Sequence, residues 1–377
     1  MSKWPGKKVI GLTGNIATGK SVVRRMLEHL GAYGIDADAL SHRAIAKGAP
    51  GYQPVIETFG KWILDDKGEI DRVKLGKLVF GDPAALAQLE AIVHPLVEHA
   101  IDLMVQRSSQ EVIVIEAIKL LETDLGKACD TIWVTDSPED VQVARLQRKR
   151  GLSREDALQR IRAQSEQARK VAAAHTLIDN TGSFEDTWIQ VVAGWKVISP
   201  ITDTSPLVLH RGEQGELTVQ RGRPRDSAGI AALITRLSGG SRPQNEADIM
   251  AAFGEKAFLL LMADNQAVGL AGWQVENLVA RTTDLYVDTH VPLDQALKTL
   301  ITEVEHASQD LQCEASLLFL LPQQANQESI WKELGYTRRT PQTLGVQAWQ
   351  DAALESQPDN TILLFKQLRQ DRVLRPI

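Results

Sequence analysis

The chain has 377 residues, of which 43% are hydrophobic and 24% charged, which suggests two domains of an ordinary soluble globular protein. Its formal net charge of −6 argues against broad nucleic-acid binding, which requires a basic surface. Cys129 and Cys313 lie far apart in the sequence, so we expect neither a disulfide framework nor a cysteine-based zinc site.

The N-terminal residues pass into an apolar run without the hydrophobic core of a signal peptide. The chain also lacks a run of about 18 apolar residues, the length that a membrane span requires. We therefore expect a cytoplasmic protein without a membrane partner. The sequence leaves the oligomeric state open.

The first half alternates short β-rich runs with helical stretches, a pattern that predicts a parallel sheet with helices on both faces. Ligands of such sheets bind beyond the carboxyl ends of the strands, so the residues that follow each run are candidate site residues. The expected strands are Lys8–Leu12, Tyr33–Asp36, Val112–Glu116, Thr131–Thr135 and Thr176–Asp179.

Directly after the first strand, Gly14–Ser21 matches the P-loop pattern G-x-x-x-x-G-K-[ST] without a mismatch. The glycines let the backbone curl so that successive N–H groups point at one phosphate. We expect Lys20 to reach the β- and γ-phosphates and Ser21 to offer its hydroxyl to Mg²⁺. A helix that begins at Ser21 would direct the positive end of its dipole at the same phosphates. The predicted nucleotide contacts are Gly14, Asn15, Ile16, Ala17, Thr18, Gly19, Lys20, Ser21 and Val22.

Two carboxylates, Asp36 and Asp38, follow the second strand. One of them could face the P-loop cleft and act as a general base toward an acceptor hydroxyl, or hold a magnesium-bound water. Aspartate is also a favoured N-cap for the helix expected over residues 39–44. The two roles are compatible, since one carboxylate can cap the helix while the other faces the cleft.

Residues 39–108 are helical by pattern and form an insertion large enough to cover the strand ends. Within this insertion, Arg72 and His94 are candidates for substrate binding. His94 precedes a proline, which favours an extended or turn conformation over the middle of a helix. The alternatives are a structural histidine and a solvated arginine.

Glu116 ends a near-continuous apolar strand, as the acidic residue of a Walker-B element does. It could position a metal ion or the acceptor, and Glu122 is a second candidate. A surface glutamate at a strand end is an equally good interpretation of either residue.

An arginine-rich segment follows over residues 145–157. Gly151 should break its first helix, and Ser153 with Asp156 is typical of a capping-box start to the next helix. Such a helical pair could be a mobile lid that closes on phosphates and supplies charge to the transition state. A solvated helix face is the alternative. Further along, Asn180 lies in a turn that could hold an adenine.

Taken in order, these segments resemble the dephospho-coenzyme A kinase family over residues 7–195. The matching segments are Gly11–Ser21, Ile35–Asp38, Val79–Pro83, His94-Pro95, the lid with Gly151-Leu152-Ser153, Gln164, and Ile178–Gly182. The resemblance implies an α/β P-loop kinase domain at residues 1–196, with an acceptor-binding helical insertion at 39–108 and a lid at 145–170. It also implies transfer of the γ-phosphoryl of ATP to the ribose 3′-hydroxyl of dephospho-coenzyme A, the last step of coenzyme A synthesis.

The same resemblance assigns roles to individual residues. Asp38 would be the base on the acceptor side, Lys20 and Ser21 would hold phosphate and Mg²⁺, and Arg145 and Arg148 would be lid arginines. The remaining acceptor-side candidates are Asp36, Arg72, His94, Glu116 and Glu122.

Two segments depart from the family pattern. In the P-loop, Asn15, Ala17 and Thr18 replace Gly, Gly and Ser. The family's Pro-Leu-Leu-x-Glu segment appears as Ile118–Glu122, which lacks the proline and brings in a lysine.

Residues 197–215 have the Pro, Ser, Thr and Gly density of a linker. Beyond it, residues 216–377 predict an α+β domain, which over 216–368 resembles the Gcn5-related N-acetyltransferase fold. That family holds the pyrophosphate of acetyl-coenzyme A on a Gly-rich turn, but Asp288–Ala296 contains no glycine and adds Asp294. We therefore expect a degenerate domain without acetyltransferase activity, which stabilises the protein, senses or binds another ligand.

Parts of the sequence also bear on three other functions. Another small-molecule or nucleoside-type P-loop kinase, with the second domain as a binding or regulatory module, stays open. A GTPase-like switch is disfavoured because the chain has no Asn-Lys-x-Asp motif. Leu237–Gly240 imitates a transporter ATPase signature, but Ser241 and Asn265 stand where that family has Gln and Glu.

Overall fold

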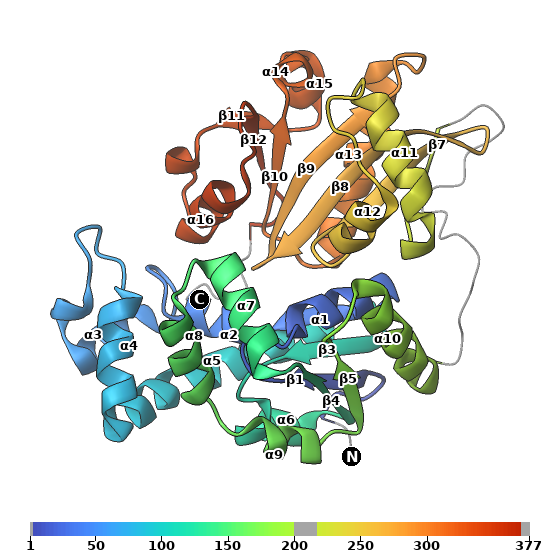
Figure 1. The fold of residues 1–377 in the computed structure, drawn as a ribbon. Helices are drawn as coiled ribbons and strands as arrows, with labels where there is room; N and C mark the ends of the chain where they lie inside the picture. The colour runs from blue at the N-terminus through green and yellow to red at the C-terminus, as the bar shows by residue number, and fades with distance from the viewer. Residues whose placement is uncertain (1–2, 200–216, 371–377) are drawn as a thin grey trace.

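The computed structural model describes residues 3–199 and 217–370, which form two domains in contact with each other (Figure 1). The N-terminal domain is drawn in blue to green and the second domain in yellow to red. Most of the predicted linker, from residue 200 on, lies outside the described residues. Among the residues described, no helix is long and apolar enough to cross a membrane.

The N-terminal domain is built on a parallel sheet of five strands in the order β2-β3-β1-β4-β5. Its strands are β1 (Lys8–Thr13), β2 (Tyr33–Asp36), β3 (Val112–Glu116), β4 (Thr131–Asp136) and β5 (Thr176–Asp179). The three strands β1, β2 and β3 therefore bring the P-loop, the aspartate pair and Glu116 to one edge of the sheet. The structure confirms the predicted parallel sheet, with strand bounds that differ by at most one residue.

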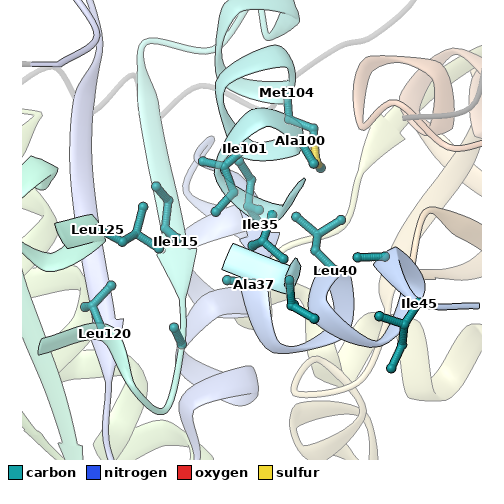
Figure 2. Close-up of a cluster of buried hydrophobic side chains, with 14 of the residues drawn as sticks. Ile35, Ala37, Leu40, Ile45, Ala100, Ile101, Met104, Ile115, Leu120 and Leu125 are labelled. Carbon is teal, nitrogen blue, oxygen red and sulfur yellow. The ribbon is translucent and has the colours of Figure 1, made fainter. Parts of the chain in front are cut away.

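Successive residues of β1 and β3 pack on opposite faces of the sheet, as strand geometry requires. Val9, Ile113 and Ile115 belong to the apolar cluster under the helical insertion, part of which is drawn in Figure 2. Ile10 and Val114 belong to the cluster on the other face, under α1 (Lys20–His29) and α10 (Phe184–Ile198). Burial of both faces explains why these strands are almost wholly apolar.

The predicted helical insertion is confirmed. It contains α2 (Ala37–Ala44), α3 (Tyr52–Phe59), a short 3₁₀ turn (Lys61–Ile63), α4 (Arg72–Gly81) and α5 (Pro83–Arg107). The expectation for His94 was wrong, because α5 runs through His94 and Pro95 without a break. Val93, Val97 and Ile101 on this helix are buried in the domain core, and that packing outweighs the local preference of a residue before proline.

The arginine-rich segment forms the predicted pair of helices. Gly151 ends α7 (Glu139–Arg150) in a left-handed conformation with φ of 62°, and Ser153 caps α8 (Arg154–Arg162) by accepting a hydrogen bond from the Asp156 N–H. The other helical elements of this half are a 3₁₀ turn (Leu120–Glu122), α6 (Asp124–Ala128) and α9 (Gln167–Ala172).

The second domain is built on a mixed sheet of seven strands in the order β11-β12-β10-β9-β8-β7-β6. Its strands are β6 (Thr218–Arg221), β7 (Ala257–Ala263), β8 (Gln266–Glu276), β9 (Val279–Val287), β10 (Ala315–Leu320), β11 (Thr337–Arg339) and β12 (Ile362–Gln367). Its helices are α11 (Ser227–Leu237), α12 (Glu246–Ala252), α13 (Leu293–Asp310), α14 (Pro322–Ala325), α15 (Glu328–Glu333) and α16 (Gln347–Ser356), with 3₁₀ turns at Pro224–Asp226 and Pro341–Thr343.

Neighbouring strands of this sheet are antiparallel except β9 and β10, which pair in parallel. The buried face of α13, which includes Leu297, Leu300 and Val304, packs in the core under the sheet. The α+β prediction for the second half is therefore confirmed. Figure 1 shows the turn between β8 and β9 directed toward the N-terminal domain.

Candidate active site

The P-loop makes a tight turn that depends on its two motif glycines. Gly14 has φ of 148° and Gly19 has φ of 100°, a region that favours glycine. A Cβ atom on Gly19 would lie 1.7 Å from Asn180 Nδ2, and one on Gly14 would lie 2.5 Å from the Thr135 carbonyl oxygen. Neither position leaves space for a side chain.

Helix α1 begins at Lys20, directly after the loop, which places its first turn at the cleft. The N–H groups of a first helical turn have no partner within the helix and are suited to an anion. Lys20 is buried, and its ammonium donates to the Asn15 carbonyl oxygen at 3.4 Å. This arrangement fits the predicted phosphate site.

Two of the P-loop residues that depart from the family pattern have structural partners. The Asn15 amide Nδ2 donates to the Ser165 carbonyl oxygen at 3.1 Å, and its Oδ1 accepts from Lys170 Nζ at 2.8 Å. Thr18 Oγ1 and Thr135 Oγ1 share a hydrogen bond of 2.7 Å. These side chains therefore fasten the loop to neighbouring segments.

Two glutamines hold the outer part of the loop. Gln167 Oε1 accepts from the Asn15 N–H at 3.0 Å, and Gln164 Oε1 accepts from the Ile16 N–H at 2.7 Å. These two N–H groups are thus used within the protein, which differs from their predicted contact with phosphate. Sequence reasoning missed Gln167 and Lys170, because nothing in the helical pattern around them distinguishes them from surface residues.

The two aspartates after β2 make different contacts. Asp36 caps α2, since its Oδ1 accepts from the Ala39 N–H at 2.8 Å. Burial and the Glu116 charge raise the pKa of the Asp36 carboxyl above its usual range. Asp38 lies in the first turn of α2 and accepts from the Ile118 N–H at 3.1 Å. Burial raises the pKa of Asp38, while the Lys20 charge opposes that rise.

Glu116 is buried, with 4% of its surface exposed, so the surface interpretation of this residue was wrong. Its Oε1 accepts from Ser21 Oγ at 2.9 Å and its Oε2 accepts from Arg24 Nε at 2.8 Å. Burial lowers the pKa of Arg24, but the Glu28 and Glu116 charges outweigh it and raise the pKa overall. Parallel pairing of β3 with β1 places this carboxylate beside the P-loop serine.

The two lid arginines differ in their surroundings. Arg145 NH1 donates to the Ala17 carbonyl oxygen at 3.0 Å, and its NH2 donates to the Asn180 carbonyl oxygen at 2.5 Å. Arg145 therefore ties the P-loop to the turn after β5. Arg148 is exposed and lines the cleft.

Asn180 uses its side chain within the protein. Its Nδ2 donates to the Thr18 carbonyl oxygen at 3.0 Å, and its Oδ1 accepts from Thr187 Oγ1 at 2.9 Å. The amide group thus packs beneath the P-loop, and its predicted contact with adenine stays a prediction.

A cleft of about 1120 Å³ joins these groups. The predicted site residues that line it are Ile16, Ala17, Gly19, Lys20, Ser21, Val22, Asp36, Asp38, Arg72, Glu116, Arg145, Arg148 and Asn180. The other predicted site residues, Gly14, Asn15, Thr18, His94 and Glu122, are not part of this lining.

The second domain forms one wall of the same cleft, which the sequence did not predict. Its lining residues include Glu255, Asn277, Arg281, Gln347, Asp351 and Glu355. They come from separate turns and helices, and nothing in the sequence indicates that they meet the P-loop.

Ser21 and Glu116 present oxygen atoms next to the phosphate site, which fits Mg²⁺, an ion that takes few protein ligands beside nucleotide phosphates. Among the residues described, three or more His, Cys, Asp or Glu side chains are nowhere grouped to hold a metal ion by themselves. The donor set therefore fits a magnesium ion shared with a nucleotide.

A sequence model of the dephospho-CoA kinase family matches residues 8–186. The dephospho-CoA kinase of Carboxydothermus hydrogenoformans is 45% identical over 187 residues, which are 49% of this chain and 91% of that protein. The dephospho-CoA kinase of Aquifex aeolicus is 43% identical over 185 residues, which are 49% of this chain and 94% of that protein.

Solved structures resemble each half of the chain separately. The structure of TT1252 from Thermus thermophilus is 31% identical, with a TM-score of 0.46, and covers 52% of this chain and 98% of its own. The structure of an N-acetyltransferase from Thermoplasma acidophilum is 12% identical, with a TM-score of 0.31, and covers 40% of this chain and 99% of its own.

Proposed function

Because the chain belongs to the dephospho-CoA kinase family, we propose that it transfers the γ-phosphoryl group of ATP to the ribose 3′-hydroxyl of dephospho-coenzyme A. The observation that carries this proposal is the shared cleft of Lys20 and Asp38, a buried ammonium beside the P-loop and a half-buried carboxylate. A phosphate donor and a hydroxyl acceptor can meet between them.

Catalysis in this cleft would rest on positioning and charge. The first turn of α1 and Lys20 would hold the ATP phosphates, while Asp38 would orient the acceptor hydroxyl and accept its proton. The Asp38 carboxylate is itself held by the Ile118 N–H, so its lone pairs have a fixed direction. The exposed Arg148 would approach the phosphates from the lid and stabilise the charge that develops on them.

Ser21 and Glu116 would hold Mg²⁺, which when bound neutralises charge on the phosphates of ATP. The oxygen atoms of Ser21 and Glu116 would then contact the ion in place of, or in addition to, their hydrogen bond with each other. Arg24 keeps the Glu116 carboxylate in place from the side of the core.

A coupled assay of ADP formation tests the proposal. The full chain is expected to consume ATP with dephospho-coenzyme A, and NMR of the product should place the new phosphate on the ribose 3′-oxygen. The 3′-deoxy analogue of the acceptor is the matched control and should give no turnover. Faster turnover with a nucleoside, a sugar or a shikimate-like acid would instead support another small-molecule kinase.

For the second domain we keep the prediction of a degenerate acetyltransferase-like unit. Asp288, at the start of the turn before α13, accepts hydrogen bonds from Arg236 NH1 at 2.5 Å and from the His290 ring. His290 and Arg236 hold the pKa of the Asp288 carboxyl well below its usual range. A carboxylate there would repel a pyrophosphate. Calorimetric titration with acetyl-coenzyme A should show no binding, and micromolar affinity would contradict this prediction.

A further inference from the structure

Two turns of the second domain contact α2, which carries Asp38, and the neighbouring helix α5. Asn277 and Leu278 form the turn between β8 and β9, while Gln312 and Glu314 lie between α13 and β10. The Glu314 N–H donates to the Leu278 carbonyl oxygen at 2.7 Å, which joins the two turns. We call these four residues the docking edge.

Arg43, in the last turn of α2, is the main polar contact of the docking edge. Its NH2 donates to Glu314 Oε1 at 2.5 Å, and its NH1 donates to the Asn277 carbonyl oxygen at 2.6 Å. The Glu314 side chain is 1% exposed and the Arg43 side chain is 12% exposed. A charge pair removed from water in this way has a fixed geometry, because each partner would be left buried and unpaired if it moved.

Leu278 adds an apolar contact. It is buried and belongs to the core cluster of the N-terminal domain that also contains Leu40 and Met104. Its φ of 60° and the φ of 53° at Asn277 lie in the left-handed region, which is unfavourable for a bulky residue such as leucine. Strain of this kind persists only where the surrounding structure enforces it.

Gln312 extends the contact to α5, the helix that packs beside α2. Its Nε2 donates to the Met104 carbonyl oxygen at 2.8 Å, and only 3% of its surface is exposed. The docking edge thus contacts α2, which carries Asp38, and α5, which packs against α2.

Helix α2 has eight residues, with the Asp36 cap and Asp38 at its start and Arg43 in its last turn. A helix this short is not stable by itself, so its position is set by the packing of its buried residues Ala37, Leu40 and Ala44 and by the contacts at its two ends. The first end is held by Asp36 and by the bond between Asp38 and the Ile118 N–H. The docking edge holds the other end.

We propose that the docking edge of the second domain positions α2 for phosphoryl transfer, with Arg43 and Glu314 as positioning residues that act on Asp38. The inference rests on the proposed function, in which Asp38 orients the acceptor hydroxyl. The second domain then contributes to the activity of the kinase domain. A small tilt of α2 would move the Asp38 carboxylate relative to the acceptor while the P-loop between β1 and α1 kept its place.

Full-length variants separate this role from simple stabilisation. Glu314→Gln removes the charge that Arg43 contacts, and the double variant R43M/E314L replaces both buried charges with apolar groups. Such replacement of a buried pair often leaves stability unchanged or improves it. Glu305→Gln is the matched control, since Glu305 is also buried and accepts from Lys366 Nζ at 2.6 Å, but lies in α13 away from the cleft.

We expect Glu314→Gln to lower kcat with dephospho-coenzyme A by about 10-fold to 100-fold, the cost of misplacing a catalytic group, while ATP affinity changes by less than about twofold. Leu278→Ala should lower kcat in the same direction. R43M/E314L should recover the melting temperature of the unaltered protein while kcat stays low. Glu305→Gln should lower the melting temperature and keep kcat within about twofold of the unaltered value.

Recovery of kcat together with the melting temperature in R43M/E314L would overturn the inference, because the pair would then act through stability alone. A folded Glu314→Gln or Leu278→Ala protein with full kcat would overturn it as well. If the unaltered chain fails to phosphorylate dephospho-coenzyme A, the proposed function itself fails, which is a distinct outcome.

Discussion

Ser21 Oγ donates a hydrogen bond to Glu116 Oε1 over 2.9 Å, so the last residue of the P-loop motif and the end of β3 are directly joined. The bond depends on strand order. Because β3 lies between β1 and β2, its carboxyl end falls between the P-loop and the aspartate pair. Glu116 is therefore placed to contact a metal ion that binds to Ser21.

Glu116→Gln should raise the Mg²⁺ concentration that gives half-maximal activity by about tenfold, a typical loss when a group that orients a metal ligand is altered. The side-chain amide introduced by this substitution has no negative charge to attract the ion, and it no longer neutralises the positive charge of Arg24. Activity measured over a Mg²⁺ series checks this. Glu28→Gln is the control, because Glu28 contacts Arg24 but not Ser21. An unchanged Mg²⁺ requirement in Glu116→Gln would exclude Glu116 from the ion site.

Asp38→Asn should lower kcat by about 100-fold to 10,000-fold, the usual contribution of a general base, with little change in ATP affinity. The amide cannot accept the acceptor proton. Fluorescent nucleotide titration and steady-state kinetics separate the two effects. Asp124→Asn changes an exposed aspartate on α6, so it is the control and should behave as the unaltered protein. Full activity of Asp38→Asn would rule out Asp38 as the base.

The decline of activity at low pH is a second test of whether Asp38 is the base. Burial raises the pKa of this carboxyl, and a base works only when it is deprotonated. Activity should therefore decline, as the pH falls, at a higher pH than an ordinary aspartate would give. A profile without an acid limb above the usual aspartate range would contradict this expectation.

Gly19→Ala should destabilise the protein by at least about 1 kcal/mol, because alanine at a positive φ is strained and its Cβ would collide with Asn180. ATP binding should weaken in parallel, since relief of the collision moves the loop. Chemical denaturation and nucleotide titration measure the two effects. Gly229→Ala, on α11 with open space around it, should be neutral or stabilising by up to about 1 kcal/mol. If Gly19→Ala and Gly229→Ala had the same stability and the same ATP affinity, the loop geometry described above would be contradicted.

His29 should make the contact between the domains sensitive to acid. Its ring shares a hydrogen bond of 2.8 Å with the Phe253 carbonyl oxygen, and burial lowers its pKa to about 3. The folded protein keeps this ring neutral while the unfolded chain protonates it near pH 6.5. The free energy of unfolding should therefore fall as the pH drops from 6.5 toward 3, by about 2 kcal/mol at pH 5 from this group.

The raised pKa of Asp36 works in the opposite direction, because folding then favours proton uptake. The measurement is therefore a difference between the unaltered protein and His29→Gln, by denaturant unfolding at pH 7 and pH 5. The unaltered protein should lose more stability than the variant. An equal loss would show that His29 does not titrate as its burial implies.

The sequence predicted the framework of the N-terminal domain because local pattern controls it. The apolar runs set the strand bounds, and the P-loop motif fixed the start of α1. The N-cap interpretation was correct for Asp36, and Asp38 lines the cleft two residues further on, while its role as a general base stays a prediction.

The parts that the sequence missed or left open depend on contacts between distant segments. Glu116 resembles a surface residue until Arg24 and Ser21 are brought beside it. His94 lies in a helix because its neighbours are buried in the core. The altered P-loop residue Asn15 is explained by Lys170, far along the chain, and no local pattern connects the two.

The turn at Asn277 and Leu278 also affects how the protein is made. A ribosome releases the chain from its N-terminus at about 5–20 residues per second. The N-terminal domain therefore emerges through α10 before this turn has been synthesised. Its apolar surface near Leu40 stays open to water and to other nascent chains during that interval, and the domain completes its core only when Leu278 arrives.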